Sequence, residues 1–138
     1  MNPNTLALLP EIVLTVAGVI VMVAEPCLPY GASRKPLGWL AILSTFGAGA
    51  ASYYQLLQTR ATNAPLHAFS NTIQVDAFSI FFHLLIAAIV IVSLLGSLDY
   101  FDRPEGHAGE YFALVLFGTV GMMSVSYTHL TLPTKRIV

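Results

Sequence analysis

Residues 77–98, AFSIFFHLLIAAIVIVSLLGSL, contain no charged side chain. A second uncharged stretch, residues 37–59, has a similar length. Each stretch is longer than 20 residues and overwhelmingly apolar. A helix of that length, rising about 1.5 Å per residue, would match a hydrocarbon core of roughly 30 Å. The two stretches therefore predict a chain that spans a lipid bilayer.

The composition supports the same interpretation. Hydrophobic residues make up 56% of the 138 residues and charged residues only 9%, whereas about a quarter of the residues in a typical soluble domain are charged. The net charge of -1 and the lack of a basic stripe argue against a nucleic-acid partner. Cys27 is the single cysteine, so no disulfide can form within these residues.

Four apolar runs are expected to form an all-α, polytopic transmembrane bundle. The first, residues 5–24, is interpreted as a retained helix and not a secretory signal, because no Lys or Arg precedes it and its apolar stretch is long. The second and third cover residues 37–57 and 77–98. The fourth, residues 110–124, stays apolar for about 14 residues, which is short of a full span. We therefore expect three complete spans and a truncated fourth.

Small residues concentrate in the middle of the second run. Gly47 and Ala51 lie four apart, and Ser44, Ala48 and Ser52 form a parallel row. Such a row allows another helix backbone to approach closely. The same stretch resembles the G-x-G-x-x-G pattern of dinucleotide sites, but it lies inside a spanning run and not between a strand and a helix. We therefore interpret these small residues as a helix-packing surface.

Polar segments separate the runs and predict how the chain is oriented. Residues 27–36, 58–74 and 99–109 are rich in prolines, glycines and polar side chains and are expected to be loops outside the membrane. With the amino terminus outside, the inner loops carry three basic residues and the outer loop one. This distribution favours an amino terminus on the outer side. The inner residues are Arg34, Lys35 and Arg103, and the outer one is Arg60.

The end of the chain differs in character from the rest. Residues 125–138 read VSYTHLTLPTKRIV, and their proline and hydroxyl side chains are expected to break the fourth helix. The first ten of these residues match, without mismatch, the conceptual translation of a transposase-type sequencing adapter. We interpret residues 125–138 as a non-native tail on a membrane segment of residues 1–124, with a natural short carboxyl terminus as the alternative. No function is assigned to His129, Lys135 or Arg136.

Short strings at the ends of the runs carry a family resemblance. LLPEI at residues 8–12 and Glu-Pro at 25–26 bound the first run, VDAFS at 75–79 opens the third, and GEYFAL at 109–114 opens the fourth. In this order and spacing they resemble the beginning of subunit N of bacterial NADH-quinone oxidoreductase, respiratory complex I, over residues 1 to about 124.

The resemblance implies an antiporter-like membrane subunit of an enzyme that couples electron transfer from NADH to quinone with proton movement. FMN, iron-sulfur clusters and quinone would be in other subunits, and this chain would bind none of them. Its partners would be the other membrane subunits of complex I and the lipid of the bacterial inner (cell) membrane. The glutamate of the family's fifth helix and the lysines of its later helices have no counterpart here, so no complete catalytic site is expected. A subunit of a multisubunit cation/proton antiporter and a structural membrane module without transport activity are the alternatives.

His83 is the candidate proton relay. It shares a helix face with Asp76 and Ser79, and an intramembrane imidazole that titrates near neutrality could pass protons. The preferred alternative is a neutral histidine that donates to a neighbouring helix, because His83 lies only about 10 Å along the helix from its polar end. No catalytic, cofactor-binding or metal-binding residue is predicted, since the histidines lack ligand spacing.

Carboxylates lie near the ends of the runs. Glu11 and Glu25, at opposite ends of the first run, are interpreted as partners of helix dipoles or lipid headgroups, with proton entry as the alternative. Asp99 and Glu110 are expected in a solvated loop or on a contact face for a neighbouring subunit.

Overall fold

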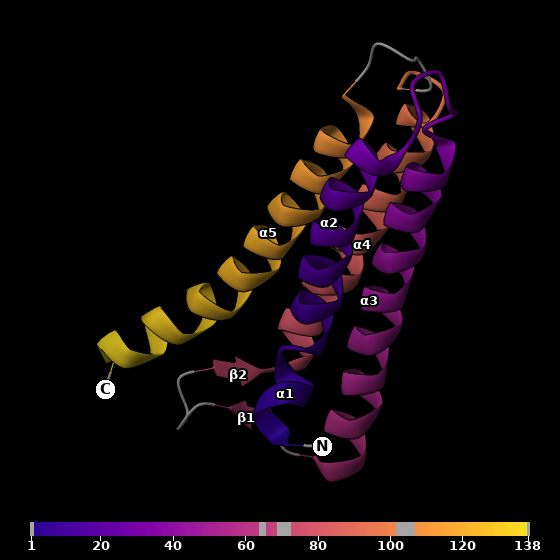
Figure 1. Cartoon of the computed structure of the whole chain (residues 1–138). Helices are drawn as coiled ribbons and strands as arrows, with labels where there is room; N and C mark the ends of the chain where they lie inside the picture. Colours follow the sequence, from indigo (N-terminus) through magenta and orange to yellow (C-terminus); the bar gives the residue numbers. More distant parts are fainter. Residues whose placement is uncertain (1, 64–65, 69–72, 102–106, 138) are drawn as a thin grey trace.

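The computed structural model describes residues 2–63, 66–68, 73–101 and 107–137. Its helices are α1 (Pro3–Ala7), α2 (Leu9–Cys27), α3 (Lys35–Thr62), α4 (Ala77–Ser97) and α5 (Ala108–Ile137), and its strands are β1 (Leu66–Ala68) and β2 (Ile73–Val75). The four long helices lie side by side, and successive ones run in opposite directions (Figure 1). The connection from α2 to α3 lies at one end of the bundle, and α1 and the two strands lie at the other.

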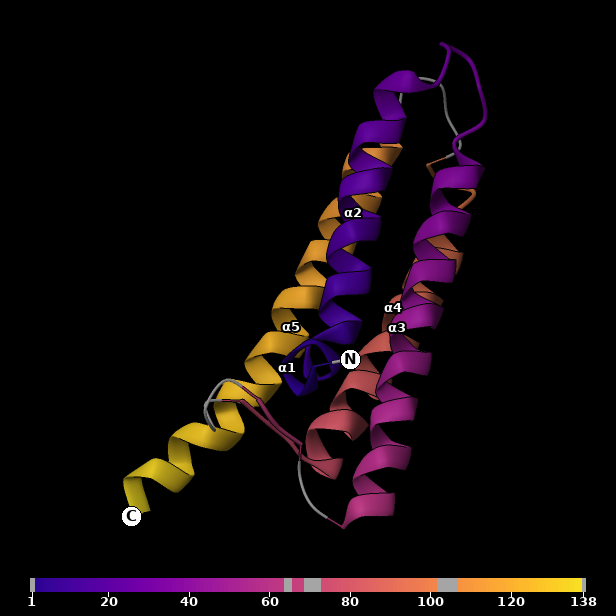
Figure 2. The same ribbon diagram turned by 60° about the horizontal axis from the view of Figure 1, so that its bottom comes forward.

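The four long helices form a closed ring of contacts. Helix α2 packs against α3 and α5, and α4 packs against α3 and α5. Figure 2 shows α2 beside α5 and α3 beside α4 in a second view. Leu14, Val21, Ala41, Leu94 and Leu116 are fully buried at the centre. Each of the four helices therefore contributes one apolar stripe to a common core.

Two members of the predicted row of small residues on α3, Ala48 and Ser52, pack into the bundle, and the third, Ser44, is half-buried. Ala48 and Ser52 are fully buried, together with Ala41 and Thr45, which continue the same stripe at spacings of three and four. Gly47 is exposed, so the pair formed with Ala51 does not make this contact. The buried stripe has a small side chain at each successive turn, so the neighbouring helices can pack against it.

The first apolar run is not one helix, which corrects the expected span of residues 5–24. Helix α1 ends at Ala7, Leu8 has φ -97° and ψ 7°, and α2 begins at Leu9. In a continuous helix the carbonyl of Leu6 would accept from the amide of Pro10, but proline has no N–H to donate. Pro10 lies instead in the first turn of α2, where a missing donor costs little.

The second run is longer than predicted at both ends. Helix α3 begins at Lys35 and continues to Thr62, five residues past the predicted end at residue 57. Polar residues alone do not end a helix, and the chain reaches Asn63, in a left-handed conformation with φ 49°, before it turns. Strands β1 and β2, an antiparallel pair with His67 opposite Gln74, also lie in the segment expected to be a loop.

The third run agrees with its prediction to within one residue, but the fourth does not. Helix α5 continues without a break through residue 125 to Ile137, where the expected end was residue 124. Residues 125–132 contain neither Gly nor Pro, so nothing in them forces the helix to stop. Side chains from residue 127 onward, including His129, Lys135 and Arg136, lie outside the described part of the chain. The non-native origin of residues 125–138 stays a prediction.

Three of the described helical segments are long and apolar enough to cross a membrane: α2, α4 and residues 108–126 of α5. The transmembrane helical class is thereby confirmed, with the short β1–β2 pair as an unpredicted addition. These three segments are not the three that were expected to be complete spans. The fourth run qualifies, whereas α3, the expected second span, is not among the three because its Gly, Ala, Ser, Tyr and Gln residues make it less apolar.

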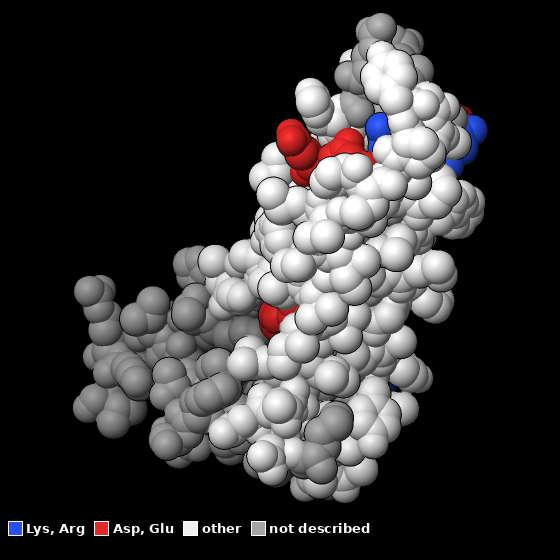
Figure 3. Space-filling model, in the orientation of Figure 1, with Lys and Arg blue, Asp and Glu red and all other residues white. Residues whose placement is uncertain are grey.

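Charged side chains gather at the end of the bundle that holds the α2–α3 connection. Figure 3 shows red and blue surface there and a mostly white body below it. Along that body, large apolar side chains such as Val16, Leu43, Phe81, Val92 and Leu114 are exposed. In a bilayer such a surface meets lipid or neighbouring helices. Arg103, which entered the orientation prediction, lies outside the described residues.

Candidate functional site

Glu11 and His83 meet in the interior of the bundle. Glu11 lies in the first turn of α2 and is 6% exposed, while His83 lies in the second turn of α4 and is fully buried. Oε1 of Glu11 is 3.9 Å from Nε2 of His83. Two titratable side chains from different helices thus face one another among apolar residues, where an isolated charge would be costly.

The helix periodicity of α4 places His83 in the core. Ser79, His83, Ala87, Val90 and Leu94 are all buried and follow one another at spacings of three and four. Ser79 therefore lies on the face of His83, as predicted. Asp76, at the amino-terminal end of the same face, is only partly buried at the N-cap position.

His83 also contacts α5. Its Nε2 atom is 3.3 Å from the carbonyl oxygen of Met123 and 3.0 Å from the hydroxyl oxygen of Ser126. The contact to a neighbouring helix that the alternative interpretation requires is therefore present. The proximity of Glu11 goes beyond that interpretation, and the role of His83 as a proton relay stays a prediction.

Glu11 was not identified from the sequence as part of an interior site. Its position near the end of a run suggested a partner for a helix dipole or a lipid headgroup, but the side chain is buried between helices. The spacing of apolar and small residues after Glu11 could have indicated this position. Glu11 precedes Leu14, Gly18 and Val21 on one helix face, and these residues are all buried.

Gln55 holds the kink between α1 and α2. Its side-chain Nε2 donates to the carbonyl of Leu6 and, at 3.1 Å, to that of Ala7. Pro10 cannot donate to the Leu6 carbonyl, which accepts the backbone N–H of the cap residue Leu8. A fully buried glutamine from α3 supplies a further donor. Gln55 continues the stripe of Ala48 and Ser52 by three residues, a signal that could have placed it in the core.

The charged end of the bundle is held by a different set of contacts. Oε2 of Glu25 accepts the backbone N–H of Glu110 at 3.1 Å, so a carboxylate at the end of α2 caps the start of α5. This is the dipole role predicted for Glu25, exerted on another helix. Arg34 Nη1 donates to the carbonyl of Glu25 at 3.3 Å, and Lys35 Nζ lies 3.3 Å from Oδ1 of Asp99.

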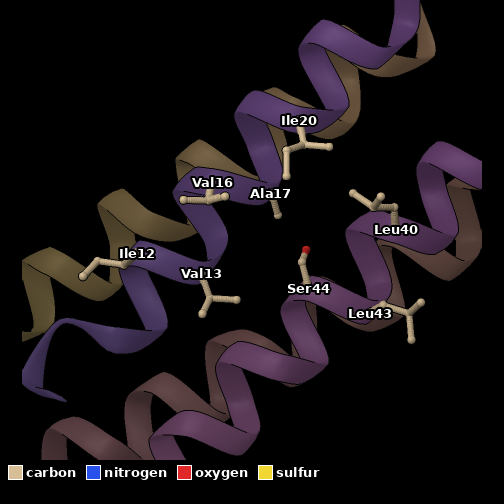
Figure 4. Close-up of a pocket in the computed structure, with 8 residues that line it drawn as sticks. All are labelled: Ile12, Val13, Val16, Ala17, Ile20, Leu40, Leu43 and Ser44. Atoms are coloured by element: carbon tan, nitrogen blue, oxygen red, sulfur yellow. The ribbon is translucent and has the colours of Figure 1, made fainter. Parts of the chain in front are cut away.

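An apolar groove of about 500 Å³ lies between α2 and α3 (Figure 4). Its lining residues are Ile12, Val13, Val16, Ala17, Ile20, Leu40, Leu43 and Ser44. The single hydroxyl, on Ser44, already donates to the carbonyl of Ala41 at 2.7 Å. The groove therefore offers packing surface and very little for a charged or strongly polar ligand. Within the described residues, no group of three or more His, Cys, Asp or Glu side chains comes together as metal ligands would.

The fold and the buried pair define a multi-pass membrane protein with an ionisable site inside its helical bundle. Curated relatives match most of the chain. NADH-quinone oxidoreductase subunit N 2 of Koribacter versatilis is 41% identical over 119 residues, 84% of this chain and 24% of that protein. NADH-quinone oxidoreductase subunit N of Methylococcus capsulatus is 35% identical over 127 residues, 91% of this chain and 24% of that protein. The resemblance to subunit N is confirmed.

A further relative has a different electron donor in its name. F(420)H(2) dehydrogenase subunit N of Methanosarcina mazei is 33% identical over 121 residues, 86% of this chain and 24% of that protein. The chain thus spans about a quarter of the length of the curated relatives that it matches. No protein-family model and no solved structure matches it.

Proposed function

We propose that this chain is part of membrane subunit N of a proton-translocating NADH:quinone oxidoreductase. The single observation that carries the proposal is the 41% identity to such a subunit over 84% of the chain. In this role the chain assembles with the other membrane subunits of the complex and couples electron transfer from NADH to quinone with proton movement. FMN, iron-sulfur clusters and quinone bind to other subunits.

The electron donor is the part of this proposal that similarity supports least. A relative from an F(420)H(2) dehydrogenase is 33% identical over a similar share of the chain, so identity in this region follows the membrane subunit and not the donor. A reduced deazaflavin is therefore a second candidate donor. The proposed coupling to proton movement is the same for both.

Purification of the complete complex through a tag on this subunit tests the proposal. We expect flavin-containing and iron-sulfur subunits to co-purify, and the reconstituted complex to reduce quinone with NADH while acidifying or alkalising the vesicle lumen. Cation/proton exchange without NADH would contradict the proposal in favour of an antiporter. Assembly without either activity would contradict it in favour of a structural module.

We further propose that the amino terminus faces the outside of the bacterial inner membrane. Cys27 is exposed at the end of α2 and would then lie on the inner side. A membrane-impermeant maleimide should label Cys27 in inside-out vesicles and not in right-side-out vesicles, with the labelled peptide identified by mass spectrometry. A Cys27→Ser, Asn63→Cys variant should give the opposite pattern, since Asn63 ends α3 at the other end of the bundle. The reverse pair of results would overturn the orientation.

A further inference from the structure

We propose that Glu11 and His83 form a single proton-binding site between α2 and α4, in which one proton is held either by Nε2 of His83 or by Oε1 of Glu11. The two atoms are 3.9 Å apart, and both side chains are removed from the surface of the bundle. The site stands on this geometry alone, and its use in pumping rests on the function proposed above.

The neighbours of Nε2 indicate that this nitrogen carries a hydrogen in the observed arrangement, as it does in an imidazolium and in one of the two neutral tautomers of imidazole. The carbonyl oxygen of Met123, at 3.3 Å, can only accept a hydrogen bond. Ser126 Oγ donates its own proton to the same carbonyl at 2.6 Å, so toward His83 it acts as an acceptor. Oε1 of Glu11, when ionised, is also an acceptor. The two acceptors within hydrogen-bond distance require that Nε2 be the donor, while Oε1 of Glu11, at 3.9 Å, is too far away to accept its hydrogen in this arrangement.

Donation by Nε2 does not depend on Ser126, which lies in the segment predicted to be non-native. Met123 lies outside that segment, and its carbonyl is an acceptor for the hydrogen on Nε2. Ser126 adds a second acceptor without changing the direction of donation.

For Glu11 and His83 taken together, electroneutrality favours one proton in addition to the single ring hydrogen of a neutral imidazole. With none, a carboxylate would be buried beside a neutral imidazole, and with two, an imidazolium beside a neutral acid; either state leaves a net charge in an apolar interior. With one proton, the pair is an imidazolium with a carboxylate or an imidazole with a carboxylic acid. Transfer from an imidazolium breaks the Nε2–H bond, forms an Oε1–H bond, leaves a neutral imidazole with its hydrogen on Nδ1 and cancels both charges. It requires the two atoms to approach from 3.9 Å by about 1 Å, to hydrogen-bond distance.

Among the described side chains, few other titratable groups face this site. On α4 the nearest is Asp76, seven residues before His83 at the helix start. On α3 the described titratable side chains are Tyr53, Tyr54, Arg60 and Lys35, all exposed. On the part of α5 whose side chains are described, Glu110 and Tyr111 lie at the opposite end of the bundle from Met123. The described side chains of α1 carry no titratable group.

Reciprocal titration of the full-length subunit, in the assembly in which it is purified, tests the proposal. The protonation of His83 is followed by nitrogen-15 magnetic resonance, and that of Glu11 by its carboxyl infrared band, assigned by difference against Glu11→Gln. If the two share one proton, Glu11→Gln shifts the titration midpoint of His83 and His83→Gln shifts that of Glu11, each by about one pH unit or more. Linkage requires the two shifts to be equal. Unchanged midpoints would overturn the proposal.

Two control variants separate a shared proton from a packing change. Ser79→Ala removes a buried polar group one turn before His83 on the same face and should leave both midpoints in place. Ser126→Ala, measured in the 138-residue chain, removes the alternative side-chain partner of Nε2. If it shifts the midpoint of His83 as much as Glu11→Gln does, the proton belongs to the α5 contact and the proposal is wrong.

Two further features keep the test decisive. If Glu11→Gln does not assemble, Glu11→Asp keeps the carboxylate on a shorter side chain and should move the midpoint of His83 by a smaller amount; no movement would contradict the site. The measurements use resting protein without NADH, so they are independent of the proposed enzyme. Equal midpoint shifts in a protein that does not oxidise NADH would support the site while the proposed function fails.

Discussion

The charged end of the bundle and its interior handle ionisable side chains in opposite ways. At the charged end, Glu25 accepts a backbone N–H of the next helix, and Lys35 and Asp99 pair on the surface with side chains 47% and 92% exposed. In the interior, Glu11 and His83 face one another with almost no exposure. Water stabilises the side chains at the charged end whether or not a partner is present. In the interior, Glu11 and His83 each depend on the other. The comparison predicts that substitutions have much larger effects inside than at the end.

The largest effect is expected for Glu11→Ala. The substitution leaves the imidazole of His83 in the core without the carboxylate beside it, and breaking such a pair should lower the free energy of unfolding by about 3 kcal/mol. Thermal unfolding in detergent, followed by circular dichroism, measures the loss. Glu11→Leu combined with His83→Phe should recover much of it, since apolar side chains can replace a buried pair. A loss no larger than that of Glu25→Ala would contradict the comparison.

The next largest effect is expected for Gln55→Leu. The substitution leaves the carbonyls of Leu6 and Ala7 without the donor that Gln55 provides, which should cost about 2 kcal/mol. Hydrogen exchange at the start of α2 should rise with it. Gln58→Leu is the matched control on the same helix, because Gln58 donates only to the hydroxyl of Tyr54 among the bonds described for its side chain. Equal effects of the two variants would argue against the role assigned to Gln55.

A smaller effect is expected for Gly109→Ala, at the charged end. A Cβ atom at residue 109 would lie 2.6 Å from Cβ and Oε2 of Glu25, so α2 and α5 must separate. We expect a loss of about 1–2 kcal/mol and faster hydrogen exchange at Glu110. Gly118→Ala, in the same helix with nothing within 4 Å of its Cβ position, should be neutral or raise stability by up to about 1 kcal/mol. If both variants behave alike, close approach at Gly109 is not what the bundle requires.

The smallest effect is expected for Lys35→Ala. The Lys35–Asp99 pair is largely exposed, and such pairs contribute less than about 0.5 kcal/mol, which salt reduces further. At low salt the unfolding midpoint of the Lys35→Ala variant should differ little from that of the parent protein. At high salt the two midpoints should be equal. A loss comparable to that of Gln55→Leu would show that the charged end is more rigid than the comparison assumes.

Some of these features could be predicted from the sequence because they are local. The bounds of α4 agree to one residue, since a charge-free stretch between Asp76 and Asp99 leaves little choice. The prediction that the fourth helix ends at residue 124 was wrong, because hydroxyl side chains were taken as stronger helix breakers than they are. The division between α1 and α2 follows from Pro10, but the donor that makes this division stable comes from Gln55, a residue distant in sequence.

The candidate site shows the same limit. The helical spacing of His83 and Ser79 predicted that they share a helix face, and the structure shows that this face is buried. The partner of His83 could not be predicted this way, because it depends on how α3 and α5 hold α2 and α4 on opposite sides of the bundle. Glu11 lies on the buried stripe of α2, yet a carboxylate near a helix start is more often a solvated dipole partner. Only the contact between helices distinguishes the two roles.

The modest apolarity of α3 has a consequence for how this chain is made. A segment that partitions weakly into lipid on its own leaves the translocon most easily with a more apolar neighbour already beside it. Helix α2 is that neighbour, since it is made first, packs along α3 and is itself apolar enough to insert. We therefore expect α2 and α3 to enter the bilayer together as a hairpin, with the small residues of α3 engaged during biosynthesis and not after it.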